Sequence, residues 1–92
     1  MKPKLKNIFL SKNVFGQLGI NRIGIFGSYA RGEKYNDIDL LLDEDPGYKK
    51  REALKNLVEH EMHVPCDVVV KNNLEPIILY YLNKDLQYVE NS

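Results

Sequence analysis

Two aspartates stand one residue apart in the segment Asp37-Ile38-Asp39, at the start of an apolar run. In a β-strand, side chains at positions i and i+2 point to the same face, so Asp37 and Asp39 would stand side by side. Two ionised carboxylates this close together repel each other unless a cation lies between them. Oxygen ligands in small number, with coordination positions left open for water and phosphate, are typical of a Mg²⁺ site. The pair therefore predicts a metal site.

A small-residue turn, Gly27-Ser28, comes shortly before this pair and follows the apolar residues Ile25 and Phe26. The backbone N–H groups of a glycine turn can approach a phosphate closely, and the Ser28 hydroxyl adds a hydrogen-bonding group. A phosphate-binding turn beside a metal site indicates metal-dependent nucleotide chemistry.

A third carboxylate, Asp67, lies in the valine-rich segment 66–70. An aspartate in such a run is unusual unless it is paired or binds a metal. If this strand lies beside the strand at 38–42, Asp67 joins Asp37 and Asp39 at one edge. Three acidic groups can hold two Mg²⁺ ions about 3.5–4 Å apart, one on the triphosphate and one lowering the pKa of an attacking hydroxyl. Asp67 would then be the proton acceptor.

The elements that must position these residues alternate along the chain. Periodicity and β-branched content predict strands at 20–26, 38–42 and 66–70 and a short edge strand at 86–89. The apolar run at 38–42 predicts a strand covered on both faces. Ser28 is expected to cap a short helical turn that ends at Gly32. Strands alternating with helices predict an α/β sandwich, a small mixed sheet with helices packed on it.

Helical spacing predicts one kinked helix or two short ones over 4–18, with Ser11 as a possible N-cap and Gly19 as the stop. The clearest helix covers 48–62. Asn73 is expected to cap a final helix that accepts Pro76 in its first turn. The predicted buried residues of this last helix are Ile77, Ile78, Tyr81 and Leu82.

Composition predicts one small globular domain, residues 1–92. Hydrophobic residues make up 43% and charged residues 28%, and 13 basic residues balance 13 acidic ones. This balance offers no basic excess for direct nucleic-acid binding and favours self-association into a homo-oligomer. The lone Cys66 excludes an intramolecular disulfide. Without a membrane-length apolar run or a secretory segment, we expect a cytoplasmic protein.

These motifs together resemble a known family. Gly27-Ser28-x-x-Arg31-Gly32, followed by Asp37-x-Asp39 and a later Asp67 in a strand, is similar to the nucleotidyltransferase superfamily of DNA polymerase beta. The small size points to its minimal nucleotidyltransferase branch. The resemblance covers roughly residues 20 to 90, and it implies the palm-like fold of that superfamily.

The resemblance also implies roles for the motif residues. Gly27 and Ser28 would bind the nucleotide phosphates, with Arg31 either contacting phosphate or bracing the loop. The aspartates would form the catalytic, Mg²⁺-binding triad. Members of this branch are typically paired with an all-helical HEPN-domain toxin. Several are antitoxins that transfer AMP from ATP onto a tyrosine of that partner, so this chain is expected to do the same.

One departure from the family pattern keeps a second function open. The segment between Ser28 and Asp37 is shorter than antitoxin members usually have, and Asn36 stands where serine is common. The alternative is therefore a non-catalytic module of the same fold that senses nucleotide or occludes its partner. Transfer to a small molecule, as in aminoglycoside nucleotidyltransferases, ranks last, because 92 residues leave no second domain for a substrate pocket.

Two other motifs can be set aside. Residues 27–32 have Walker A spacing, but Glu33 and Lys34 stand where a P-loop needs Lys and Ser or Thr. His60 and His63 are spaced one residue short of a zinc-binding His-Glu-x-x-His helix.

Overall fold

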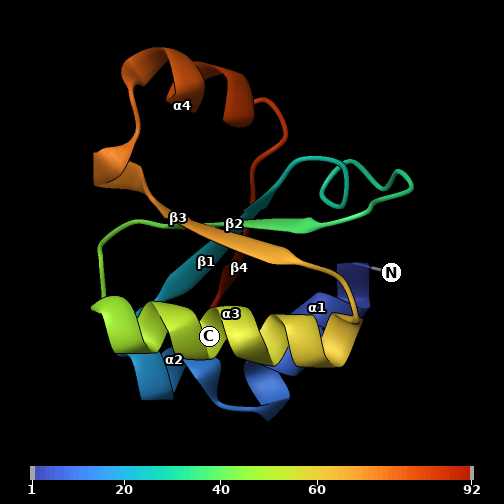
Figure 1. Ribbon diagram of the computed structural model, residues 1–92, viewed down its shortest axis with the longest axis vertical. Coiled ribbons are helices and arrows are strands. Elements are labelled where there is room, and N and C mark those ends of the chain that lie inside the picture. The colour runs from blue at the N-terminus through green and yellow to red at the C-terminus, as the bar shows by residue number, and fades with distance from the viewer. Residues whose placement is uncertain (1, 92) are drawn as a thin grey trace.

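The protein is built around a four-stranded mixed sheet in the order β3-β2-β1-β4 (Figure 1). The computed structural model describes the backbone of residues 2–91 and the side chains of residues 5–91. The strands are β1 (Arg22–Phe26), β2 (Ile38–Leu42), β3 (Cys66–Val70) and β4 (Gln87–Glu90). β2 pairs with β3 in parallel, and β1 pairs antiparallel with both β2 and β4. The predicted α/β sandwich with a mixed sheet is confirmed.

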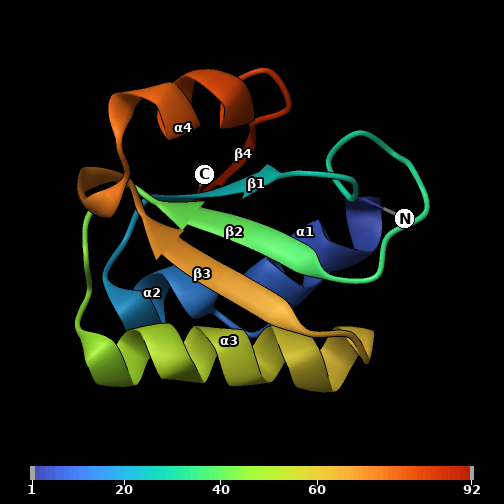
Figure 2. The ribbon, with the colours of Figure 1, turned by 45° about the horizontal axis from the view of Figure 1, so that its top comes forward.

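The helices cover the two faces of the sheet unequally (Figure 2). Three of them lie on one face: α1 (Lys2–Ser11), α2 (Val14–Leu18) and α3 (Tyr48–Met62). After β3, the 3₁₀ turn η1 (Lys71–Asn73) leads to α4 (Pro76–Leu82), which lies over the opposite face. α3 is the longest, and no helix within residues 2–91 has the length and apolarity needed to cross a membrane.

The main core lies between the sheet and the three-helix face. Alternation along β2 sends Ile38, Leu40 and Leu42 to this face, and all three are fully buried. On the opposite face Leu41 is also fully buried, whereas Asp39 is half-buried. The predicted burial of both faces of this strand is therefore confirmed at Leu41 but not at Asp39. The helices contribute a matching apolar layer, which includes Leu5, Phe9, Phe15, Leu54 and Val58.

The N-terminal segment forms two helices, one of the two predicted arrangements. Ser11 is not the N-cap of the second helix, because α1 continues through it. Asn13 precedes α2 instead, in the left-handed conformation with φ of 53° and without a side-chain capping bond. Gly19 ends α2 as predicted. Its φ is 70°, and its N–H donates to the Phe15 carbonyl at 2.9 Å.

Two predictions about the last helix are wrong. Glu75, not Asn73, stands at the N-cap of α4, because residues 71–73 form their own 3₁₀ turn. The predicted buried side is mostly exposed as well: Leu82 is buried, but Ile77, Ile78 and Tyr81 are not. Hydrophobic spacing identified the helix correctly, but it could not reveal that the sheet beneath α4 carries the polar site.

A pair of Leu→Ala variants tests how strongly α3 stabilises the sheet. Leu54 on α3 is 2% exposed, whereas Leu10 on α1 is 45% exposed. We expect Leu54→Ala to lower the free energy of unfolding by about 2–5 kcal/mol through lost burial and a residual cavity. Leu10→Ala should change it by no more than about 1 kcal/mol. Urea denaturation measures both, and equal losses would contradict this packing.

Candidate active site

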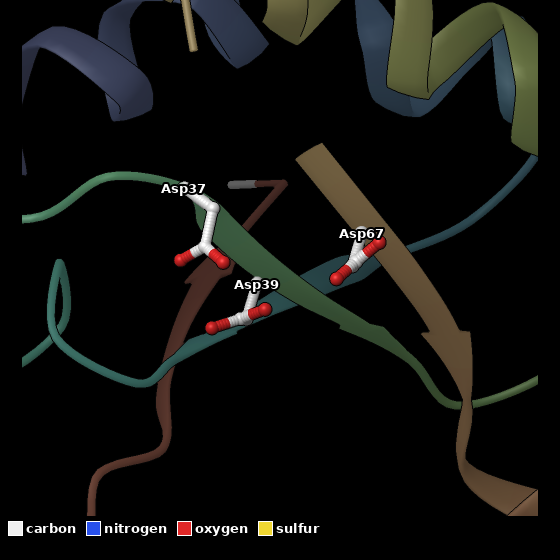
Figure 3. Close-up of side chains that lie close together, drawn as sticks. All are labelled: Asp37, Asp39 and Asp67. Carbon is white, nitrogen blue, oxygen red and sulfur yellow. The ribbon is translucent and has the colours of Figure 1, made fainter. Parts of the chain in front are cut away.

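Three carboxylates converge on the face of the sheet that carries α4 (Figure 3). Asp37 immediately precedes β2, Asp39 lies within it, and Asp67 lies in β3. One oxygen of each of the three carboxylates lies within 4.8 Å of the others. Asp37 and Asp67 are exposed and Asp39 is half-buried, so the cluster opens to solvent.

The parallel register brings Asp67 to this position. Asp39 on β2 is the direct partner of Asp67 on β3. Two hydrogen bonds secure the start of this pairing. The Ile38 N–H donates to the Pro65 carbonyl, and the Cys66 N–H donates to Glu59 Oε2 on α3, both at 2.9 Å. Helix α3 thus fixes the end of β3 that carries the third carboxylate.

Burial and mutual repulsion act on the central carboxylate. Partial burial raises the pKa of Asp39 above its ordinary value of 3.8, and the neighbouring charges of Asp37 and Asp67 raise it further. The ionised form of Asp39 is therefore penalised in the folded protein. A bound cation would relieve this penalty.

Gly27 is required by the position of Asp39. It follows β1, where Phe26 pairs with Asp39. Its φ of +79° favours glycine, and a Cβ atom built on it would lie 2.5 Å from Asp39 Oδ2. The absence of a side chain thus allows the backbone of the turn to lie directly against the acidic cluster.

The segment after Gly27 is a series of turns and not the short helix that was expected. The Arg31 N–H donates to the Gly27 carbonyl at 3.2 Å, and the Glu33 N–H donates to the Ser28 carbonyl at 3.1 Å. Tyr29 anchors the segment, since it is 2% exposed and its ring packs edge-on against Tyr35 at 4.8 Å. Ser28 is half-buried next to Gly27.

Arg31 is held by two carboxylates. Its Nη1 donates to Asp85 Oδ2 at 2.6 Å, and its Nε lies 3.1 Å from Glu33 Oε1. A second bond joins the same two segments, from Gln87 Nε2 to the Ala30 carbonyl at 3.0 Å. These contacts brace the turn against the connection between α4 and β4. No motif in the sequence pointed to Asp85, because it reaches Arg31 from 54 positions away.

A pocket of 560 Å³ extends from the acidic cluster toward α4. Asp39 and Asp67 line one part of it together with Gly27. The remaining wall is largely apolar and comprises Phe26, Val68, Val69, Leu74, Ile78, Tyr81 and Leu82, with Asp85 also at the boundary. Hydrophobic spacing alone did not reveal this wall, because it placed Ile78 and Tyr81 in the core.

The donor set fits a divalent cation of the Mg²⁺ type. All three groups are carboxylates, the hard oxygen ligands that Mg²⁺ prefers, and their oxygens are close enough to share a metal site. The open side of the cluster leaves room for water and phosphate ligands, and the raised pKa of Asp39 favours binding of positive charge.

Comparison with known proteins identifies the family. Residues 2–89 match the family described as "Nucleotidyltransferase domain". The chain belongs to this family. A relative from Thermococcus cleftensis, named protein adenylyltransferase MntA, is 33% identical over 82 residues, which cover 85% of this chain and 83% of the relative.

Solved structures support the fold of this nucleotidyltransferase domain. A toxin–antitoxin crystal structure with AMP-PNP superposes with a TM-score of 0.70 at 17% identity, covering 95% of this chain and 73% of the other. A mutant of the toxin–antitoxin pair MntA-HpeT gives a TM-score of 0.66 at 14% identity, covering 94% and 74%. At this level of identity the likeness concerns the fold alone.

Replacing Gly27 tests the packing of the turn against the cluster. We expect Gly27→Ala to lower Mg²⁺ affinity about tenfold, because the added Cβ must displace the Asp39 carboxylate. Calorimetric titration with MgCl₂ measures the affinity. Gly19→Ala is the matched control: its φ is +70° and nothing lies within 4 Å of the added Cβ. Both variants carry about 1–2 kcal/mol of left-handed strain. Equal Mg²⁺ affinity in the two variants would contradict the contact.

Partial burial and charge repulsion at Asp39 predict a pH-dependent gain in stability from Asp39→Asn. Folding raises the pKa of Asp39 above its ordinary value of 3.8. The stability that Asp39 contributes is therefore fully present below pH 3.8 and is lost as the pH rises through the pKa of the folded state. At pH 7 with EDTA, we expect Asp39→Asn to stabilise the protein by about 0.5 kcal/mol, a small figure because water screens this half-exposed site. That corresponds to about 2–4 °C in Tm.

The gain should shrink near pH 3, where wild-type Asp39 is largely protonated. Saturating Mg²⁺ should raise the Tm of the wild-type protein and have little effect on the variant. Thermal denaturation at the two pH values, with and without Mg²⁺, measures these differences. A lower Tm for the variant in EDTA at pH 7 would contradict a net penalty on the ionised Asp39 carboxylate.

Proposed function

We propose that this chain, acting as one nucleotidyltransferase domain over residues 1–92, transfers AMP from ATP to a hydroxyl group of a partner protein. The observation that carries the proposal is the convergence of three carboxylates within 4.8 Å beside the Gly27 turn. We infer further that the acceptor is a tyrosine of a HEPN-type toxin and that the transfer silences it, which makes the chain an antitoxin.

The relatives support the two parts of this proposal separately. The Thermococcus cleftensis relative is named a protein adenylyltransferase, which supports AMP transfer to protein. The structural neighbours are toxin–antitoxin complexes, one of them with AMP-PNP, which supports a toxin as partner and a nucleotide as substrate.

In the proposed reaction, the acceptor hydroxyl oxygen forms a bond to the α-phosphorus of ATP. The bond from that phosphorus to the bridging oxygen breaks, and pyrophosphate leaves. Asp67 accepts the proton of the hydroxyl. The N–H groups of Gly27 and Ser28, with the Ser28 hydroxyl, bind the phosphates, and Arg31 steadies the turn or contacts phosphate.

The three aspartates would hold Mg²⁺, with room for two ions. Bound Mg²⁺ supplies positive charge to the triphosphate and lowers the pKa of the attacking hydroxyl. Asp37, just before β2, and Asp39 within it keep their oxygens close together, and Asp67 completes the set from β3.

A non-catalytic module that occludes its partner or senses nucleotide is the second candidate. The shorter segment between Ser28 and Asp37 favours it, because this segment sets how the turn lies over the carboxylates. The two candidates differ in whether neutralisation of the partner needs ATP and the triad.

A label-transfer assay separates them. We expect the purified chain, with Mg²⁺ and ATP labelled on the α-phosphate, to label a HEPN-type toxin partner. Asp39→Ala should reduce labelling at least about hundredfold, because one residue of the metal-binding set is lost. Glu44→Gln, an exposed carboxylate change outside the cluster, is the control and should label normally.

A neutralised toxin without label would overturn the catalytic proposal and favour the occluding module. Label that persists in Asp39→Ala would instead exclude the triad as the catalytic centre. Mass spectrometry of the labelled toxin would identify the acceptor, and a residue other than tyrosine would revise that part of the proposal alone.

A further inference from the structure

Helix α4 has an unusual combination of composition and exposure. Its sequence, PIILYYL, contains no charged residue, yet Leu82 is its one buried residue. The exposed fractions are 58% for Ile77, 44% for Ile78, 63% for Tyr80 and 60% for Tyr81. Exposed apolar side chains that gather on one element mark a binding surface more often than an accident of packing.

Two of these side chains face the pocket that contains the acidic cluster. Ile78 and Tyr81 line it, whereas Ile77 and Tyr80 do not. The opposite wall is formed by the sheet, with Asp39 and Asp67 at one part and Val69 further along β3. At 560 Å³ the pocket lies in the size range of small-molecule sites, about 300–1,000 Å³.

The two parts of the pocket differ in chemistry. The part at Asp39 and Asp67 suits metal ions and phosphate, while the remaining wall offers hydrocarbon and the aromatic rings of Phe26 and Tyr81. A nucleotide has the same division, since its triphosphate is highly charged and its base is flat and uncharged. Aromatic side chains bind such bases by stacking, regardless of which base is present.

We propose that the adenine base of ATP binds in the apolar part of this pocket, with Tyr81 as the stacking side chain and Ile78 beside it. This inference rests on the proposed function, because it takes ATP as the nucleotide held at the triad. The base is covalently joined to the phosphates, so it must lie within one nucleoside length of the carboxylates. Ile78 and Tyr81 line the same pocket as Asp39 and Asp67.

Tyr80 and Tyr81 have nearly the same surroundings. The Tyr80 ring meets the Tyr81 ring edge-on at 5.5 Å, and Lys84 Nζ lies 5.2 Å from both ring centroids. These contacts are nearly equivalent for Tyr80 and Tyr81, and the exposed fractions of the two residues are similar. Tyr81 lines the pocket and Tyr80 does not, so the two tyrosines form a matched pair for mutation.

Calorimetric titration of the full chain tests the proposal with two probes, ATP and inorganic tripolyphosphate, both with Mg²⁺. Tyr81→Ser should weaken ATP binding about tenfold, because stacking on the base is lost. It should leave tripolyphosphate binding unchanged, because that probe has no base. Tyr80→Ser should bind both probes as the wild type does.

A second matched pair guards against misfolding. Ile78→Ser should also weaken ATP binding selectively, and Ile77→Ser should not; circular dichroism melting checks that each variant folds. ATP affinity that stays the same in Tyr81→Ser and Ile78→Ser overturns the base site, and so does an equal loss for both probes. Unchanged ATP affinity with a raised KM for the toxin would assign the wall to the acceptor.

Two outcomes distinguish a failure of the base site from a failure of the proposed function. If the wild-type chain binds neither ATP nor tripolyphosphate, the nucleotide function itself fails and the base site fails with it. If the wild type binds both and the tyrosine pair shows no difference, the base site alone is wrong.

Discussion

The parallel pairing of β2 with β3 is the constraint on which the site depends. In this register Asp39 and Asp67 are direct partners, so carboxylates from distant parts of the chain meet on one face. A shift of one residue would send Asp67 to the opposite face, among the buried apolar side chains. Because apolar side chains alternate with these aspartates, hydrophobic burial enforces the register that holds the negative charges together.

This arrangement places stabilising and destabilising interactions on opposite faces of the same strands. The face toward α1, α2 and α3 buries Ile38 and Leu40 completely and supplies the hydrophobic free energy of folding. The other face carries the partial burial and the charge repulsion that raise the pKa of Asp39. The well-packed face therefore offsets a charge cluster that disfavours folding until a cation binds. A stability cost of this kind is common at functional sites.

The turn that follows Gly27 is held from both of its sides. Tyr29 anchors it in the core, and Arg31 joins it to Asp85 near the end of α4. The turn thus lies against Asp39 at Gly27 and is joined by Arg31 to Asp85, which follows α4 and lines the same pocket. This connection gives a physical basis for one pocket that receives both ends of a nucleotide. It also accounts for the exposure of Ile78 and Tyr81, which the proposed base would cover.

Local patterns were sufficient for much of this structure. The strands at 38–42 and 66–70 and the helix at 48–62 have the predicted bounds, because each is a strongly periodic or apolar run between turn residues. The acidic residues were visible as candidates, since aspartates are unusual in apolar strands. The caps were less predictable. Ser11 and Asn73 have suitable side chains, but neighbouring turns placed Asn13 and Glu75 at those positions.

The sequence by itself determined the nucleotidyltransferase fold, the three candidate carboxylates and the position of the glycine turn, because these depend on residue type and local pattern. Only the tertiary structure decided that Asp85 holds Arg31 and that Ile78 and Tyr81 line the pocket and not the core. Such contacts depend on how distant segments cross, and no local periodicity records which side of a helix meets a polar surface. The apolar pattern of α4 would be the same for a helix packed into the core and for one that lines a pocket. The polar face of the sheet beneath α4 decided that it lines a pocket.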